Sequence, residues 1–389
     1  MLNFNFQVPT RIIFGRDRVD ELGKELLKYG RRVLLVYGGG SIKRSGLYER
    51  VLKIFADNEI SHIELSGVQP NPRITSVREG VRLCRNHDID LVLAVGGGST
   101  IDCAKIIAAG VKYEGDPWDF FTRKARITGA LPIGTILTLA ATGSEMNVNA
   151  VISNEATNQK LGTGSSHLYP RFSILDPTLT FTVPASQTAA GTADIISHIF
   201  EQYFSPTPGG FVQDRMAEAM LKTCIHYGPI AIAEPDNYEA RANLMWTSTL
   251  ALNGLLSTGR HTDWGVHEIE HVISALYDVT HGLGLAILIP YWMRHVLSER
   301  TAPKLAEYAR RVWDITEDDD FGAAMTGIAR TAEFFRSLGL AGNLQEIGVE
   351  ESRLEEMADQ LSTNRRPLGA FGQLNQGDIL AILQSAYKG

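Results

Sequence analysis

The chain has 389 residues, of which 44% are hydrophobic and 21% charged, and its formal net charge is −7. This length exceeds one ordinary core and predicts a soluble protein of two domains. Because the net charge is negative and Lys and Arg are scattered, a general affinity for nucleic acid or anionic membranes is excluded.

No apolar run reaches the length of a transmembrane helix, and the first residues lack the basic and then apolar pattern of a secretory signal. Cys84, Cys103 and Cys224 lie far apart and form no CxxC pair. We therefore expect a reduced, cytoplasmic protein without disulfides.

The first half of the sequence alternates strand-like and helix-like segments. Buried strands are predicted at 32–37, 62–65, 90–95, 131–137 and 172–175, and helices at 45–57, 74–87 and 99–109. This alternation predicts a parallel, doubly wound sheet. The alternating Phe4, Phe6 and Val8 predict one further half-buried strand at the N-terminus.

After residue 184 the strand signals nearly vanish. Helices are predicted at 216–224, 240–253, 264–277, 304–313 and 323–337. We therefore expect an α/β dinucleotide-binding domain over residues 1–180 and an all-helical domain over residues 181–389. The cleft between two such domains is the default place for a ligand site.

A glycine run joins a predicted strand to a predicted helix at residues 96–98. Glycines let the backbone approach a phosphate closely, and the free N–H groups at a helix start attract a pyrophosphate. Ser99 is predicted to cap this helix, with Asp102 reaching back to the cap. A plain structural turn needs fewer glycines, so phosphate binding is the favoured interpretation.

A second run, Gly38, Gly39 and Gly40 followed by Ser41, also lies between a strand and a helix. Neither run matches the GxGxxG dinucleotide fingerprint. No carboxylate ends the first strand, where it could hold a ribose 2′-hydroxyl, and Lys43 and Arg44 lie just beyond. This favours NADP(H) over NAD(H), although both cations could simply be solvated.

Four residues of the second half have the character of one metal site. Asp194 and His198 are spaced i, i+4, which places them on one helix face, and His267 and His271 repeat that spacing. His281 follows a short break at Asp278. Asp194, His198, His267 and His281 form a ligand set for one divalent cation, Fe²⁺ or Zn²⁺. A single helical histidine is more often an ordinary core or surface residue, so the site depends on the combination.

The segment His267–Glu268–Ile269–Glu270–His271 also matches the HExxH signature of zinc metallopeptidases, with Glu268 as the base. The two glycine runs, the missing secretory signal and the Asp194/His198 pair argue against this alternative. A non-catalytic nucleotide sensor of the same fold is the other alternative.

Taken together, these motifs resemble the iron-containing (group III) alcohol dehydrogenase family, in its NADPH-dependent butanol dehydrogenase branch. The likeness covers essentially the whole chain and is carried by FGRDRVDELG, AVGGGSTIDCAK, TLAATGSEMN, ILDPTLTFTVP, TAAGTADIISHIFEQYF and WGVHEIEHVISALYDVTHGLGLAILIP. It implies the fold shared with dehydroquinate synthase. One departure is Thr192–Ala193, where glycine is common in the family.

The resemblance also implies residue roles. Asp194, His198, His267 and His281 bind the cation, and His271 lies near the substrate without being a ligand. Gly97, Gly98 and Ser99 hold the pyrophosphate, and Gly39 replaces the aspartate of many NAD-using relatives. The positions that line the nicotinamide are Thr138, Thr142, Asn147 and Lys160.

The expected reaction is reversible hydride transfer between NADP(H) and a short-chain aldehyde or alcohol, with the metal stabilising the alkoxide. His271 is a candidate proton relay, or it merely packs against a ligand. An NAD-dependent, glycerol-type dehydrogenase of the same fold is the runner-up. A dehydroquinate synthase-like elimination would need a basic cluster that the helical half lacks. A homodimer formed through roughly the first 15 residues is expected.

Overall fold

The computed structural model describes residues 1–362 and 367–389, which divide into two compact units. One unit, here called the α/β unit, consists of Gln7–Val183 and Pro235–Thr249. The other, the helical unit, consists of Met1–Phe6, Pro184–Glu234 and Leu250–Gly389. The sequence-based boundary near residue 180 lies close to the 183/184 junction. Residues 1–6 belong to the helical unit, although the sequence-based boundary put them in the α/β domain. Residues 235–249 belong to the α/β unit, although that boundary put them in the helical domain.

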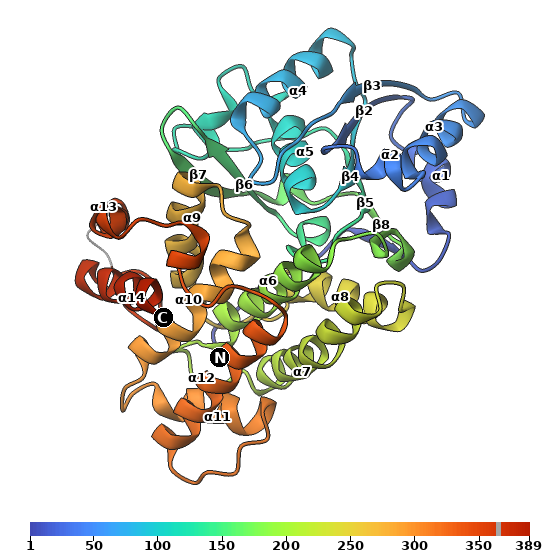
Figure 1. Cartoon of the computed structure of the whole chain (residues 1–389). Coiled ribbons are helices and arrows are strands. Elements are labelled where there is room, and N and C mark those ends of the chain that lie inside the picture. The colour runs from blue at the N-terminus through green and yellow to red at the C-terminus, as the bar shows by residue number, and fades with distance from the viewer. Residues whose placement is uncertain (363–366) are drawn as a thin grey trace. The chain divides into compact units, whose positions relative to one another are not determined.

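The α/β unit is built on a six-stranded sheet whose neighbouring strands are all parallel, as predicted (Figure 1). The strand order is β1-β8-β5-β4-β2-β3. The strands are β1 (Arg11–Phe14), β2 (Arg32–Tyr37), β3 (Ser61–Leu65), β4 (Leu91–Gly96), β5 (Ile133–Leu137) and β8 (Phe172–Leu175).

Helices cover both faces of this sheet. They are α1 (Leu22–Leu26), α2 (Ser41–Arg44), α3 (Leu47–Asp57), α4 (Ile74–Asn86) and α5 (Gly98–Gly110), and most of α8 (Tyr238–Ala251) also belongs to this unit. Leu34 and Val36 of β2 pack into one core with α4 and α5, while Val33 and Leu35 pack into the other core with α1 and α3. This period-2 alternation is the pattern of a strand buried on both faces.

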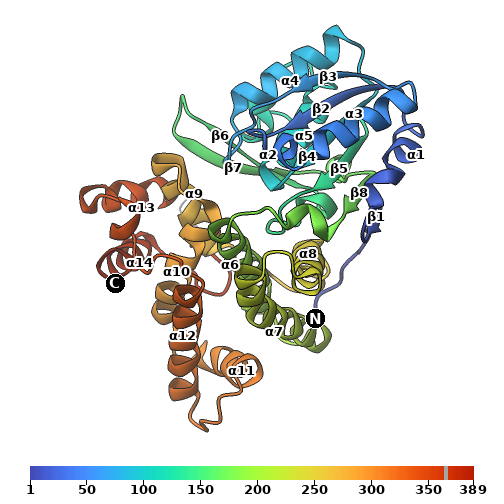
Figure 2. The same ribbon diagram turned by 45° about the vertical axis from the view of Figure 1, so that its right-hand side comes forward.

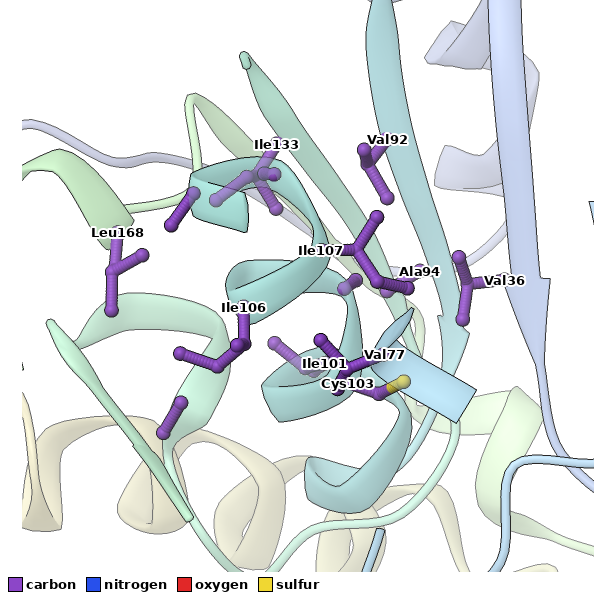
Figure 3. Packing of buried hydrophobic residues seen from close by; sticks show 14 of the residues in the cluster. Val36, Val77, Val92, Ala94, Ile101, Cys103, Ile106, Ile107, Ile133 and Leu168 are labelled. Carbon is purple, nitrogen blue, oxygen red and sulfur yellow. The ribbon is translucent and has the colours of Figure 1, made fainter. Parts of the chain in front are cut away.

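Helix α5 is almost entirely buried in the first of these cores. Ile101 and Ile107 of α5 lie among Val36, Val92 and Ala94 of the sheet, as Figure 3 shows. Its first turn follows the glycine run directly, so the packing of α5 fixes the position of that run.

A two-stranded antiparallel hairpin, β6 (Asn149–Asn154) and β7 (Gln159–Gly164), was not predicted. Each strand has six residues, as many as β2 and β4. However, β7 is polar and β6 has only three apolar residues in a row, so the hairpin lacks the long apolar run by which β2 and β4 were recognised. The strand predicted at Phe4–Val8 is wrong: residues 1–10 form no strand, and the first strand begins at Arg11. Phe4 and Phe6 are half exposed, so the alternation there does not report a buried face of this chain.

The helical unit consists of α6 (Ala185–Tyr203), α7 (Phe211–Ala233), α9 (Gly265–Tyr277), α10 (His281–Val296), α11 (Ala302–Val312), α12 (Asp320–Ser337), α13 (Leu354–Ser362) and α14 (Gln376–Lys388). Helix α6 packs along α7 and α10, as Figure 2 shows for α6 and α7. Helix α10 was not predicted because Pro290 interrupts its pattern. Across residues 1–362 and 367–389, none of the helices combines the length and the apolar character needed to cross a membrane.

Candidate metal and coenzyme sites

The four predicted metal ligands meet within the helical unit. Asp194 and His198 lie on α6, His267 on α9, and His281 is the first residue of α10. Potential ligand atoms of Asp194, His267 and His281 all lie within 4.8 Å of one another. The Nδ1 of His198 lies 3.6 Å from Oδ1 of Asp194, and its ring stacks on that of His267 with centroids 4.9 Å apart. Three helices thus bring one carboxylate and three imidazoles together.

Local backbone chemistry places His281 at this point. Asp278 adopts a left-handed conformation (φ 52°) that ends α9, and α10 begins three residues later. A Cβ atom on Gly282 would lie 1.9 Å from the carbonyl oxygen of Ala190, one turn before Asp194 on α6. Only glycine permits that approach, so Gly282 lets the start of α10 reach the ligand-bearing part of α6.

Two buried carboxylates that the sequence did not reveal orient the histidines. Glu201 accepts a hydrogen bond from Nδ1 of His267 at 2.8 Å and from the backbone N–H of His267 and of Trp264. Glu270 contacts Nδ1 of His281 and accepts from the hydroxyl of Ser274. Each carboxylate engages Nδ1, so the Nε2 atom of each ring is the one left to bind a cation.

Glu201 and Glu270 could have been noticed from spacing alone. Each lies three residues after a predicted ligand on the same helix, Glu201 after His198 and Glu270 after His267. In both cases, however, the histidine that the carboxylate contacts through a side chain belongs to another helix. That pairing depends on the packing of α6, α9 and α10, which the spacing does not show.

The donor atoms fit a divalent cation. Oδ1 of Asp194 and Nε2 of His267 are buried and make no hydrogen bond within the described chain, an arrangement that buried polar atoms rarely adopt without an ion or water. Nε2 of His281 lies 3.8 Å from Oδ1 of Asp194. Burial opposes protonation of His267, but the hydrogen bond and charge of Glu201 outweigh it and raise the pKa of the imidazole.

His271 lies at the edge of this cluster. Its ring centroid is 6.4 Å from that of His267 and 5.4 Å from that of His281, and it is only partly buried. Ligand atoms of Glu270, His271 and His281 form a second close group. Within that group, Glu270 already contacts His281. It also accepts a hydrogen bond from the hydroxyl of Ser274, which is not part of the group.

Within the α/β unit, the two glycine runs follow neighbouring strands. Tyr37, the last residue of β2, pairs with Val95 of β4, so residues 38–40 and 97–98 lie at adjacent strand ends. Strand β2 has β3 on one side and β4 on the other, which makes this the topological switch point of the sheet. Open α/β sheets bind their ligands there.

The cap predicted at Ser99 is wrong. Helix α5 already begins at Gly98, its cap residue is Gly97, and no side chain caps it. Both carboxylate oxygens of Asp102 accept bonds from the chain after β5: Oδ1 from the Ser144 hydroxyl at 2.5 Å and Oδ2 from the backbone N–H of Val151 at 2.8 Å. Asp102 bonds to these distant residues because the segment after β5 packs against the first turn of α5. The free N–H groups remain at the glycine run.

The residues expected around the nicotinamide occupy two segments. Thr138, Thr142 and Asn147 lie in the chain after β5, where the backbone N–H of Thr138 donates to the carbonyl of Gly96. Asn147 is buried, and its side-chain amide donates to the Gly143 carbonyl at 3.0 Å, while its Oδ1 accepts from Lys105 of α5. Lys160 is buried on β7 of the hairpin.

The loop after β2 leaves open space. Gly39 is exposed, and a Cβ atom added there would meet no other atom within 4 Å. Lys43 is exposed, but its ammonium lies 4.5 Å from the ring centroid of Tyr48. Glu64 accepts hydrogen bonds from the hydroxyls of Tyr37 and Tyr48, both at 2.6 Å. The Glu64 carboxylate therefore bonds to the two tyrosines whose rings lie near the Lys43 ammonium.

Comparison with known proteins assigns the chain to a family. The iron-containing alcohol dehydrogenase model matches residues 9–177, and the Fe-containing alcohol dehydrogenase C-terminal model matches residues 188–387. The chain is 53% identical to NADH-dependent butanol dehydrogenase A of Clostridium acetobutylicum, over 100% of both chains. It is 40% identical to the NADPH-dependent aldehyde reductase YqhD of Escherichia coli, over 93% of each.

Among solved structures, that of NADH-dependent butanol dehydrogenase A from Thermotoga maritima superposes with a TM-score of 0.95 and 39% identity, over 100% of this chain and 99% of the other. The chain belongs to the iron-containing alcohol dehydrogenase family. It is therefore an oxidoreductase, and membership implies a nicotinamide coenzyme and a divalent metal.

Proposed function

We propose that the chain catalyses reversible hydride transfer between NADP(H) and short-chain aldehydes and alcohols of about the size of butanol. The substrate class rests on the relatives named butanol dehydrogenase and aldehyde reductase, which align with nearly the whole chain. The observation that carries the chemistry is the pair of buried, unpartnered ligand atoms on Asp194 and His267.

The metal ligands in this proposal are Asp194, His198, His267 and His281, which hold one Fe²⁺ or Zn²⁺ ion. When bound, a divalent cation polarises the substrate carbonyl and stabilises negative charge on its oxygen. Glu201 and Glu270 fix the ring orientation of His267 and His281 and make them stronger donors. The ligand set suits both metals equally.

His271 is proposed to move the proton that the substrate oxygen gains or loses. Its ring lies beside that of His281, with the two centroids 5.4 Å apart. An imidazole has a pKa near neutrality, which suits it to accept and release a proton under working conditions.

The coenzyme is proposed to bind at the switch point of the sheet. Backbone N–H groups at Gly97, Gly98 and Ser99 face the pyrophosphate, and Thr138, Thr142, Asn147 and Lys160 form the nicotinamide side. The adenosine ribose lies toward Gly38, Gly39, Gly40 and Ser41, where nothing fills the space at Gly39.

The most specific part of the proposal is the preference for NADP(H) over NAD(H). The open space at Gly39 and the cations Lys43 and Arg44 support a 2′-phosphate. The relatives differ, because butanol dehydrogenase A of C. acetobutylicum is named NADH-dependent and YqhD of E. coli NADPH-dependent. We favour NADP(H) because the residues of this chain leave room for the additional charge and supply cations nearby.

The alternative within the same fold is an NAD-dependent polyol dehydrogenase of the glycerol type. The 1,3-propanediol dehydrogenase of Klebsiella pneumoniae, 30% identical over 99% of both chains, supports a substrate with more than one hydroxyl. We further propose a homodimer in the cytoplasm. Its support is the exposure of Met1, Leu2, Phe4 and Phe6, an apolar set that a monomer would leave in water.

An absorbance assay at the NADPH band tests the proposal. Purified enzyme, loaded with Fe²⁺ or Zn²⁺, is given a panel of linear aldehydes, glycerol with NAD⁺, 1,3-propanediol with NAD⁺, and a casein peptide. We expect NADPH oxidation with butyraldehyde, its loss after chelation, and its return when metal is restored. Undiminished turnover by metal-free protein, or diol oxidation that exceeds aldehyde reduction, would overturn the assignment.

A further inference from the structure

A fully buried lysine lies two turns into helix α5, in the α/β unit. Lys105 has no exposed surface. Its ammonium donates to the Ser144 hydroxyl at 2.9 Å, to the carbonyl of Asn147 and its Oδ1, both at 3.0 Å, and to the carbonyl of Asn149 at 2.8 Å. Four acceptors therefore converge on a group that has three N–H bonds.

Burying this charge is costly, so its presence calls for a reason. Desolvation lowers the pKa of Lys105 to about 8, against the opposing effect of the Asp102 and Glu145 carboxylates. An apolar residue of similar volume is often at least as stabilising as a buried charge. It would, however, remove the donor that Lys105 supplies to all four oxygens. Two of these have one further bond, because Oδ1 of Asn147 also accepts from the backbone N–H of Asn149 and the Ser144 hydroxyl donates to Asp102.

The acceptors all belong to the chain that follows β5. Asp102, one turn before Lys105 on the same helix face, bonds to the same stretch through Ser144 and Val151. The Ser144 hydroxyl donates to Asp102 and accepts from Lys105, so it links the two. The segment 144–151 is thereby attached to α5 at several successive points.

The glycine run at the start of α5 touches the same segment. A Cβ atom on Gly98 would lie 2.2 Å from Oγ1 of Thr142. Helix α5 thus carries the proposed pyrophosphate loop at its first residue. It also hydrogen-bonds to the proposed nicotinamide segment through Asp102 and Lys105.

We propose that Lys105, linked with Asp102 through Ser144, is a positioning residue that sets the nicotinamide-side segment 142–149 at a fixed place relative to the pyrophosphate loop. It touches neither coenzyme nor substrate; it acts through Ser144, Asn147 and Asn149. This inference rests on the coenzyme site under the proposed function.

The experiment compares two ligands that share the pyrophosphate end and differ in the nicotinamide. NADPH carries the ring, and 2′-phospho-ADP-ribose lacks it; NADH and ADP-ribose are measured in parallel. Dissociation constants are taken by calorimetry on full-length protein without substrate, so the readout is binding and not turnover. The variants are Lys105→Met and the milder Ser144→Ala, and each is checked by thermal melting.

The matched control is Val51→Ala, a buried position in the same unit that belongs to the core with α1 and α3. It lowers stability without touching the segment 142–149.

We expect Lys105→Met to weaken NADPH binding about tenfold, the scale of losing a charged donor, and to leave 2′-phospho-ADP-ribose within about twofold. Ser144→Ala should show the same split to a smaller degree, and Val51→Ala should change neither ligand. Equal weakening of both ligands in Lys105→Met and Ser144→Ala, or no weakening of either, overturns the positioning role. Failure of wild-type protein to bind any of the four ligands would instead overturn the proposed coenzyme site.

Discussion

Oε1 of Glu201 on α6 lies 2.8 Å from Nδ1 of His267 on α9 and also accepts the backbone N–H of His267 at 3.1 Å. One carboxylate therefore fixes both the helix position of His267 and the tautomer of its ring. Its other oxygen accepts from the backbone N–H of Trp264, so Glu201 also satisfies a donor at the start of α9.

Replacing Glu201 with Gln should weaken metal binding by about 10- to 100-fold, the usual effect of removing such a partner of a metal-bound histidine. Glutamine keeps the size of the side chain but loses the charge that strengthens the Nδ1 contact. Competition with a chromogenic chelator measures the affinity. Glu268→Gln on the exposed face of α9 is the matched control and should leave it unchanged. An equal loss in both variants would show that Glu201 has no particular role at the metal.

Asp194→Ala and His267→Ala should each abolish metal binding and turnover. Both variants should keep the fold, because the sheet of the α/β unit contains none of the four ligands. Saturating metal, at about 100 times its dissociation constant, should stabilise wild type by about 2.7 kcal/mol and neither variant. Full metal occupancy in either variant, measured by elemental analysis, would remove that residue from the site.

Gly39→Asp should shift coenzyme preference from NADPH toward NADH by about tenfold or more, since a carboxylate there repels the 2′-phosphate and can accept from a free 2′-hydroxyl. The open space at Gly39 should let the variant fold normally. The ratio of kcat/KM values for the two coenzymes is the readout, and Arg44→Gln should move it the same way by a smaller amount. Wild type that already prefers NADH would show that our interpretation of this loop is wrong.

The parallel sheet was predictable mainly from β2 and β4, which are apolar runs that lead into glycine runs, and such strands are typical of a sheet buried on both faces. The hairpin β6–β7 and helix α10 were missed because they lack such patterns. Strand β7 is polar and β6 has only a three-residue apolar run, and Pro290 breaks the periodicity of a helix that is nonetheless formed. The alternation of Phe4 and Phe6 led to a wrong strand prediction, because an alternating pattern does not show whether the apolar side chains are buried.

The candidate site, like the fold, was predictable from the sequence only in part. Spacing brought Asp194 and His198 onto one face, but it could not show that Glu201 on that helix serves His267 on another. Asp102 looked like a local cap because three residues separate it from Ser99, whereas its bonds are made to Ser144 and Val151, far along the chain. Long-range pairing of polar groups has no periodic signature.

Stability should depend on pH through Asp263. Burial raises the pKa of this carboxyl to about 6, with a contribution from Glu201, although Gly265, Phe371 and Gly372 donate backbone N–H bonds to it. The folded protein therefore holds the proton more tightly than the unfolded chain. The resulting stability is full below the unfolded pKa and is lost as pH rises through about 6.

Against Asp263→Asn, which does not titrate, the melting temperature of wild type should fall progressively between about pH 4 and pH 7. A shift of about two pKa units corresponds to about 3 kcal/mol over that range. Parallel pH curves for the two proteins would show that Asp263 ionises normally in the folded state.

The dimer prediction concerns the N-terminal segment. Met1, Leu2, Phe4 and Phe6 expose between 44% and 67% of their surface, and the segment continues into β1, which lies at an edge of the sheet. Exposed apolar side chains invite association, and two-fold dimers are the commonest soluble assembly. Light scattering should give about twice the chain mass of 42.7 kDa.

Deleting residues 1–9, or replacing Phe4 and Phe6 together by Ser, should shift the protein toward the monomer. The double variant keeps the backbone bonds of the segment to the helical unit, from Met1 to Pro208 and from Leu2 to Gly259, so it tests the apolar surface alone. Thr326→Ser on α12, outside the segment, is the control and should remain dimeric. A monomeric wild type at micromolar concentration would contradict the prediction, and so would a dimer that the deletion leaves unchanged.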